Sequence, residues 1–208
     1  MALIVIGGHS RSVGKTSVVA GLISALPELN WTAVKITQYG HGICSANGKP
    51  CDCTCPDHSW AITEERDRSG QSDTSRFLVA GAARSLWVRT EQGRLAEAVP
   101  TLRAKIADST NVIMESNSIL KFVQPDLYLT VLNPATTDFK KSAREFLDRA
   151  HAVILHAAPN GNVTWPNVPL ELAKDRPIFR ITPPPYVTAE IVAFIRCAAS
   201  PLQTKSQS

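Results

Sequence analysis

The sequence predicts an α/β fold with a mainly parallel sheet. An apolar run from Ala2 to Ile6 leads through a glycine-containing loop into a helical segment that starts at Ser17. Short strand-like and longer helix-like segments then alternate along the rest of the chain. Such alternation favours helical crossovers between strands, and strands joined by crossovers lie parallel.

The expected elements follow in a regular order. Strands are expected at Leu3–Ile6, Trp31–Thr37, Ser85–Arg89, Asn111–Glu115, Leu127–Leu132, Ala152–His156 and Ile178–Ile181. Helices are expected at Ser17–Ala25, Asp73–Ala83, Leu95–Ala107, Lys140–Ala150 and Thr188–Ala198. The second of these helices places Phe77, Leu78 and Ala82 on one face, which is the spacing of an amphipathic helix.

Residues 40–71 differ from the rest because Gly, Pro, Cys, Asp and His are dense and no hydrophobic period holds. We interpret this stretch as a loop inserted into one domain of residues 1–200, followed by a flexible polar tail at 201–208. A length of 208 residues suits a single domain, and the 44% hydrophobic content is enough for a sizeable core.

Charge and hydropathy give no indication of a nucleic-acid-binding protein or of a membrane protein. The formal net charge is +4, and Lys and Arg are scattered, so charge gives no indication of nucleic-acid binding. No apolar stretch approaches the ~18 residues that span a bilayer. The first apolar run is also too short for a secretory signal, so we expect a cytoplasmic protein without a membrane partner.

The segment around Gly14-Lys15-Thr16 has the layout of a phosphate-binding loop, or P-loop. Loop amides and a helix N-terminus favour an anion there, and the lysine would reach the β- and γ-phosphates of a nucleotide. The strict spacing requires a glycine where His9 stands, so this loop is one residue longer. The alternative is an ordinary glycine-rich turn. The predicted nucleotide-binding residues are Gly8, His9, Ser10, Arg11, Ser12, Val13, Gly14, Lys15, Thr16 and Ser17, and for Arg11 a solvated side chain is an equal alternative.

Three further residues are candidates for catalysis or for Mg²⁺. Glu115 ends an apolar strand, where a carboxylate can hold Mg²⁺ together with the Thr16 hydroxyl; the alternative is a surface glutamate. Asp73 either caps the helix that begins near Thr74 or faces the metal. Lys35, at the end of the second strand, either contacts the γ-phosphate or a substrate anion, or lies on the surface. The predicted catalytic set is therefore Lys15, Glu115, Asp73 and Lys35.

Four of the five cysteines cluster in the 40–71 segment. Structural disulfides are disfavoured in the cytosol, whereas four thiolates can hold Zn²⁺ or an iron–sulfur cluster. The alternative is a loop with free thiols. The predicted ligands are Cys44, Cys51, Cys53 and Cys55, flanked by His41 and His58. We expect the fifth cysteine, Cys197, to be a small buried hydrophobe on the last helix.

The motifs resemble the MobB family of GTP-binding accessory proteins of molybdopterin-guanine dinucleotide synthesis. Its Gly-x-Ser-x-x-Gly-Lys-Thr loop is similar to Gly8–Thr16, and its acidic residue before Ser or Thr at a helix start is similar to Asp73-Thr74. Its Glu-Gly corresponds to Glu115-Ser116, so the glycine is replaced. Lys35–Gly40 also resembles, more weakly, the Lys-Pro-x-Gln-x-Gly of dethiobiotin synthetase. The resemblance implies a three-layer P-loop NTPase fold and a homodimer.

These observations predict Mg²⁺-dependent binding and hydrolysis of ATP or GTP in cofactor or metal-centre biosynthesis. No Asn-Lys-x-Asp element follows the strand at 152–156, so the base is not assigned. A small-molecule substrate or a client metalloenzyme is the expected partner. An ATP-dependent small-molecule ligase or kinase, and a nucleotide-gated binding module, are the alternatives.

Overall fold

The structure is a computed structural model that describes residues 1–40, 59–157, 165 and 175–199. In these ranges a single sheet has the strand order β3-β4-β2-β5-β1-β6-β7-β8. The strands are β1 (Ala2–Gly8), β2 (Trp31–Tyr39), β3 (Trp60–Glu64), β4 (Arg84–Glu91), β5 (Asn111–Glu115), β6 (Leu127–Leu132), β7 (Ala152–His156) and β8 (Ile178–Ile181). All neighbouring pairs are parallel except β3 with β4.

The register places the last residue of β5 beside residues that lie shortly before the ends of β1 and β2. β5 lies between β1 and β2, and Glu115 is opposite Ile6 on one side and Lys35 on the other. In parallel sheets ligands bind beyond the carboxyl ends of the strands, so this edge is where a site is expected. Both central strands β1 and β5 are almost wholly buried, which explains their continuous apolar sequences.

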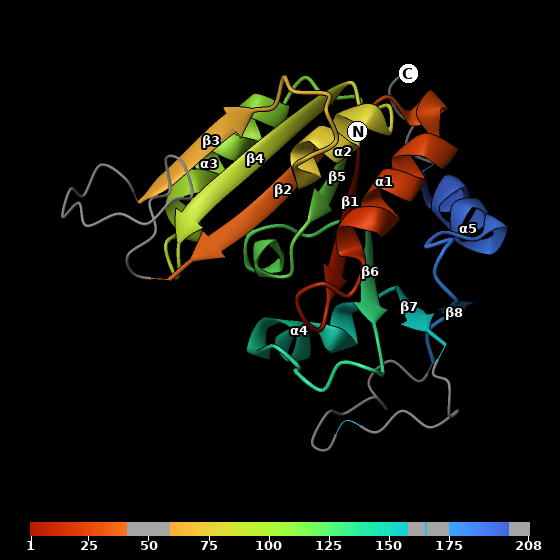
Figure 1. The fold of residues 1–208 in the computed structure, drawn as a ribbon. Coiled ribbons are helices and arrows are strands. Elements are labelled where there is room, and N and C mark those ends of the chain that lie inside the picture. Colours follow the sequence, from red (N-terminus) through yellow and green to blue (C-terminus); the bar gives the residue numbers. More distant parts are fainter. Residues whose placement is uncertain (41–58, 158–164, 166–174, 200–208) are drawn as a thin grey trace.

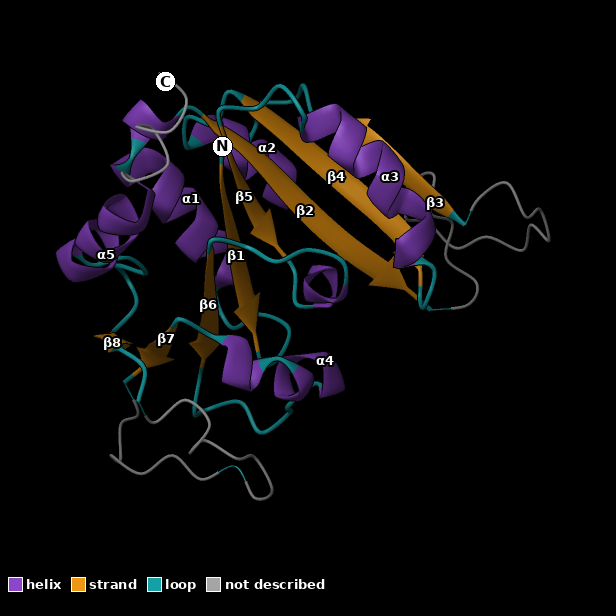
Figure 2. Cartoon of the chain, turned by 180° about the vertical axis from the view of Figure 1, so that it is seen from behind, coloured by secondary structure: helices purple, strands orange, loops and turns teal. Residues whose placement is uncertain are grey.

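Helices cover both faces of the sheet (Figures 1 and 2). On one face lie α1 (Lys15–Ala25), α2 (Asp73–Val79) and α5 (Ala189–Ala199), whose buried side chains share a core with β1, β5 and β6. On the other face α3 (Leu95–Ile106) packs against β2 and β4, and the turn after α4 (Lys141–Glu145) joins the same core through Phe146 and Ala150. The result is a three-layer α/β arrangement, as the sequence predicts.

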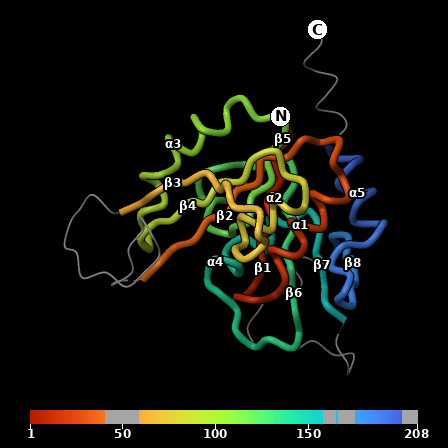
Figure 3. The backbone as a smooth tube through the Cα atoms, turned by 45° about the horizontal axis from the view of Figure 1, so that its top comes forward, coloured from red at the N-terminus to blue at the C-terminus, as the bar shows by residue number. Residues whose placement is uncertain are grey.

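The helix α5 lies beside α1, although the two are far apart in the sequence (Figure 3). Its Ile191, Ile195 and Ala199 are buried in the same core as α1, and Arg196 pairs with Glu28 at 3.1 Å. None of the helices in the described ranges combines the length and the apolar character needed to cross a bilayer.

Four sequence-based expectations about the elements are wrong. The strand β3 lies within the stretch expected to be a loop; its side chains are only partly covered, so no strong period marks it. The helix α2 ends at Val79, not Ala83, because Gly81 takes a left-handed φ of 106°. The helix expected at Lys140–Ala150 is a five-residue α4 followed by a 3₁₀ turn at Leu147–Arg149. Cys197 is exposed rather than buried.

Two expectations fall outside the described ranges. The cysteine cluster at Cys44, Cys51, Cys53 and Cys55 lies in residues 41–58, and the tail expected to be flexible lies in residues 200–208. The zinc or iron–sulfur site, the single-domain boundary at residue 200 and the tail therefore stay predictions.

Candidate nucleotide-binding site

The loop between β1 and α1 turns sharply at its end. Ser12 and Gly14 have positive φ angles of 55° and 91°, and Gly14 immediately precedes the first residue of α1. A Cβ at Gly14 would lie 2.3 Å from Cε1 of Tyr186, so this position needs glycine for space as well as for its backbone angle. The first amides of α1 have no partner within the helix and carry the positive end of its dipole, which favours an anion at this point.

Lys15 folds back over this loop. Its Nζ donates a hydrogen bond of 2.6 Å to the carbonyl oxygen of Ser10. Burial lowers the pKa of Lys15 to about 8; the carboxylate of Glu115 raises it in part, and the nearby cations Lys140 and Lys35 lower it further. The Lys15 ammonium is thus held, poorly hydrated, at the opening of the loop between β1 and α1, where a phosphate would compensate its charge.

His9, the residue that lengthens the loop, is fully buried. Its amide donates to the carbonyl oxygen of Val131 at 3.2 Å and so continues the pairing of β1 with β6 by one residue. The ring is hydrogen bonded on both sides: Nδ1 to the carbonyl of Asp138 at 2.8 Å, and Nε2 from the amide of Asn133 at 3.0 Å. Nδ1 therefore carries the proton, and burial lowers the pKa of His9, which keeps the ring neutral.

The ring and the amide of His9 thus already have protein partners, and a contact of His9 with a nucleotide stays a prediction. The ring packs between Phe139 and Trp165, with centroids 5.1 and 5.0 Å away. Ser10, also predicted to contact nucleotide, uses its hydroxyl to donate to Asp138 Oδ2 at 2.7 Å. The extra residue fastens the loop to the segment after β6.

A chain of polar contacts runs across the carboxyl ends of the strands. The Thr16 hydroxyl donates to Glu115 Oε2 at 2.8 Å. The ammonium of Lys35 donates to Glu115 Oε1 and pairs with Asp73 Oδ2 at 2.9 Å, and its Nζ lies 3.4 Å from Thr16 Oγ1. Glu115 is only 3% exposed, so it is not the surface glutamate of the alternative interpretation. The structure brings the predicted residues Thr16, Lys35, Asp73 and Glu115 together.

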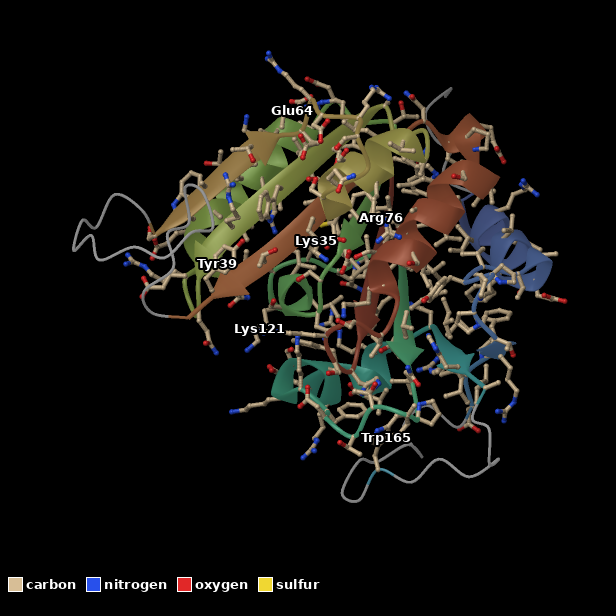
Figure 4. The ribbon with its side chains drawn as sticks, in the orientation of Figure 1. Lys35, Tyr39, Glu64, Arg76, Lys121 and Trp165 are labelled. Atoms are coloured by element: carbon tan, nitrogen blue, oxygen red, sulfur yellow. The ribbon has the colours of Figure 1, made fainter. Side chains whose placement is uncertain are left out.

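The cap of α2 is Ser72, not Asp73. The Ser72 hydroxyl accepts a 3.0 Å hydrogen bond from the amide of Ser75. Asp73 is the first residue of the helix, and its carboxylate lies 3.8 Å from Arg76 as well as 2.9 Å from Lys35. Figure 4 shows Lys35 on β2 and Arg76 on α2 on the side of the sheet that carries α1. Asp73 therefore faces the site.

Asn117 contributes a contact that the sequence analysis missed. Its side chain makes two hydrogen bonds with the backbone of Gly8. Asn117 Oδ1 accepts from the Gly8 N–H at 2.9 Å, and Asn117 Nδ2 donates to the Gly8 carbonyl oxygen at 2.8 Å. A Cβ on Gly7 would lie 2.2 Å from Asn117 Oδ1, so the glycine makes room for this contact. The only sequence signal is its place two residues after Glu115, at the end of a strand next to β1.

The site carries an excess of positive charge. Arg76 donates to the Ser17 hydroxyl at 3.1 Å, Arg11 is exposed, and burial followed by repulsion from Arg11 lowers the pKa of Lys140. Among the residues that the structure describes, the cations around the loop are Arg11, Lys15, Lys35, Arg76 and Lys140, and the carboxylates are Asp73, Glu115 and Asp138. This surplus favours a polyanion with several charges.

The donor set also fits Mg²⁺. Mg²⁺ takes oxygen ligands and is usually bound by one or two carboxylates, substrate phosphates and waters. The Thr16 hydroxyl donates to the buried Glu115 carboxylate, and these two side chains supply oxygen atoms of this kind. No group of three or more His, Cys, Asp or Glu side chains within the described ranges could hold a metal ion by itself. The site is therefore suited to a metal that shares its ligands with a phosphate.

Comparisons of this chain with known proteins identify its fold. No family model matches the sequence, and no curated protein matches it. Among solved structures, HypB from Helicobacter pylori in complex with nickel is similar over 96% of this chain and 87% of that chain, with a TM-score of 0.52 and 15% identity. The chain has a P-loop NTPase fold.

Two further solved structures are similar at lower TM-scores. FlhF complexed with GMPPNP and Mg²⁺ matches over 95% of this chain and 74% of its own, with 14% identity and a TM-score of 0.46. MobB from Bacillus subtilis matches over 94% of this chain and 96% of its own, with 13% identity and a TM-score of 0.41.

The affinity for a nucleoside triphosphate is expected to fall as the pH rises above about 8. In the free protein Lys15 loses its proton near that pH, and a bound polyphosphate would raise the pKa of the ammonium, so binding above pH 8 must take up a proton. The dissociation constant should rise by up to about tenfold per pH unit there and by no more than about twofold between pH 7 and pH 8. Calorimetry in buffers of different ionisation enthalpy measures both effects. A constant affinity up to about pH 9.5, without proton uptake, would contradict this role of Lys15.

Proposed function

We propose that this chain binds a nucleoside triphosphate together with Mg²⁺ and hydrolyses it. The observation that carries the proposal is the polar chain from Thr16 through Glu115 and Lys35 to Asp73, directly beside the N-terminus of α1. In this function the amides between Ser10 and Thr16 and the Lys15 ammonium bind the β- and γ-phosphates. Backbone donors that are already aimed at the developing charge need no reorganisation during the reaction.

Each remaining residue then has a defined task. Thr16 and Glu115 would hold Mg²⁺, which supplies charge neutralisation between the β- and γ-phosphates. Lys35 is held between two carboxylates close to Thr16, and its ammonium would bind the γ-phosphate. Asp73 pairs with Lys35 and is far more exposed than Glu115, so we assign it the task of orienting the attacking water.

Removal of Mg²⁺ tests this proposal. Phosphate release from ATP and from GTP is measured with the full chain, with Mg²⁺ and then with excess EDTA. We expect phosphate release from at least one nucleotide and its loss with EDTA, because the charge on the γ-phosphate is then no longer neutralised. Restoration by added Mg²⁺ is the control. Unchanged hydrolysis in EDTA would contradict the proposed metal, and the lack of binding of either nucleotide would contradict the function. Tight binding with negligible hydrolysis would favour a nucleotide-gated binding module.

The biological process proposed is cofactor or metal-centre biosynthesis, with a client metalloenzyme or a small molecule as partner. The support comes from the four clustered cysteines, from the resemblance to MobB and from the similarity to HypB, whose structure is a complex with nickel. Metal analysis and an absorbance spectrum of anaerobically purified protein test the cysteine site. Stoichiometric zinc in a colourless protein, or visible charge-transfer bands, would support it. A metal content that does not change when Cys51, Cys53 and Cys55 are replaced by serine would contradict it.

A further inference from the structure

A cavity of about 320 Å³ opens next to the polar chain, on the same face of the sheet. Its lining comes from β2, β4 and the start of α2. The lining residues are Lys35, Thr37, Gln71, Ser72, Asp73, Thr74 and Trp87. The volume is at the lower end of the range for small-molecule sites, and it is separate from the cradle formed by the loop before α1. The cavity therefore suits a second, small ligand rather than the nucleotide.

The aromatic wall of the cavity is held in one orientation. The indole Nε1 of Trp87 donates to the Thr37 hydroxyl at 3.1 Å, and the guanidinium carbon of Arg89 lies 4.4 Å from the centre of the indole ring. Because Thr37 accepts from the indole, its own hydrogen is left to donate to a ligand. A fixed ring beside a free hydroxyl donor is an arrangement that binds a compact ring with polar substituents.

The other walls are rich in hydroxyl, amide and carboxylate groups. Ser72 and Thr74 are fixed by hydrogen bonds from their hydroxyls to Glu65 Oε2, at 3.1 and 2.7 Å. Gln71 is exposed and supplies both an amide donor and an acceptor. Because Ser72 and Thr74 use their hydroxyl hydrogens on Glu65, the neutral lining side chains left to donate to a ligand are Gln71 and Thr37, beside the charged Lys35 and Asp73. An aromatic ring with these polar groups matches a compound with several hydroxyl groups better than an apolar one.

Two residues belong to both the cavity and the nucleotide site. Lys35 and Asp73 line the cavity, and Lys35 also contacts Glu115, which accepts from Thr16. The side chain of Asp73 is 43% exposed, so its carboxylate is accessible from the cavity. A ligand hydroxyl bound at Asp73 would thus lie next to the Lys35 ammonium, whose Nζ is 3.4 Å from Thr16 Oγ1 in the nucleotide site.

We propose that the cavity binds a hydroxylated ring compound of monosaccharide or nucleoside size, which accepts the γ-phosphoryl group. This inference rests on the proposed nucleotide site. In the reaction the ligand O–H bond breaks and its proton goes to the Asp73 carboxylate, while the ligand oxygen forms a bond to the γ-phosphorus. The bond from the γ-phosphorus to the bridging oxygen breaks, and the nucleoside diphosphate leaves with that electron pair. Lys35 neutralises charge on the transferred group.

The test follows the fate of the labelled γ-phosphate of ATP and GTP with four probes: D-ribose, D-glucose, myo-inositol and uridine. Chromatography separates a phosphorylated probe from inorganic phosphate. We expect one phosphorylated probe per nucleoside diphosphate with at least one of the four. Nucleotide binding with inorganic phosphate as the only labelled product for all four would overturn this inference and leave the proposed function standing. The absence of nucleotide binding would overturn the proposed function itself.

Two cavity variants give a readout that is independent of the chemistry at the phosphate. For the probe that accepts the phosphoryl group, Trp87→Ala is expected to raise the KM by about tenfold, and Thr37→Val is expected to raise it by about fivefold. The dissociation constant for the nucleotide should stay within about twofold in both, which also shows that each variant is folded. Thr101→Val, on α3 on the opposite face of the sheet, is the matched control for Thr37→Val and should change neither constant. Equal KM values in the wild type and both cavity variants would place the acceptor elsewhere and overturn the inference.

Discussion

The replacement of Lys15 by alanine is expected to abolish nucleotide turnover and to weaken nucleotide binding at least about a hundredfold. Lys15 is the cation at the mouth of the loop, and its ammonium is already desolvated there, so the variant loses a strong contact to the β- and γ-phosphates. The measurements are the dissociation constant of a fluorescent ATP or GTP analogue and the rate of phosphate release.

Lys141→Ala is the matched control for this substitution. Lys141 is the first residue of α4, and its side chain is exposed, so its loss removes the same charge without touching the loop. It should bind and turn over nucleotide like the wild type. Wild-type turnover by the Lys15→Ala protein would show that the loop is not a phosphate cradle.

Glu115→Gln is expected to reduce turnover by about 10²–10³-fold while nucleotide binding stays measurable. Glutamine has nearly the same shape, and its carbonyl oxygen can still accept from Thr16, but it carries no charge for Mg²⁺ and leaves Lys35 with Asp73 as its carboxylate partner. The rate of phosphate release at saturating nucleotide, measured over a range of Mg²⁺ concentrations, should also require more Mg²⁺ for half of its maximum.

The control for charge removal is Glu145→Gln. Glu145 pairs with Lys121 at 3.3 Å on the surface of α4, where such pairs contribute little. Its variant should match the wild type in both rate and Mg²⁺ requirement. If Glu115→Gln also matched the wild type, Glu115 would serve only to position Lys35, and the proposed metal set would be wrong.

Local spacing explains why the central site could be predicted. Lys15 and Thr16 follow from the Gly-Lys-Thr run after a strand, and Glu115 follows from its place at the end of an apolar strand. The sequence predicts Lys35 at the end of its strand, but β2 continues to Tyr39. The register then makes them neighbours, since Lys35 is directly opposite Glu115. For residues of this kind, the position in the sequence determines at which edge of the sheet they lie, and the pairing of the strands makes them neighbours.

Contacts between segments that are distant in sequence could not be predicted in this way. The burial of His9 depends on Asn133 and Asp138, more than a hundred residues away. Asn117 reaches Gly8 across a similar separation. Nothing in the spacing of these residues differs from that of an ordinary polar loop.

The exposure of Cys197 is a different case, because the local pattern did contain the answer. In α5 the buried positions are Ile191, Ile195 and Ala199, which recur every four residues and define the inner face. Cys197 lies two residues from the last two of these positions and is therefore on another face of the helix. The general preference of cysteine for the interior was a weaker guide than the helical period.

The imidazole of His9 has a consequence for the way in which this loop can move. Because the backbone amide of His9 is bound to β6 and both of its ring nitrogens are bound to the segment after β6, the first part of the loop is attached to the sheet. Any adjustment to an arriving triphosphate must then occur beyond that anchor. Movement of the loop is therefore confined to the few residues up to Gly14, among which Ser12 has a positive φ, an uncommon backbone conformation for this residue type. Induced fit at this site is accordingly short in range.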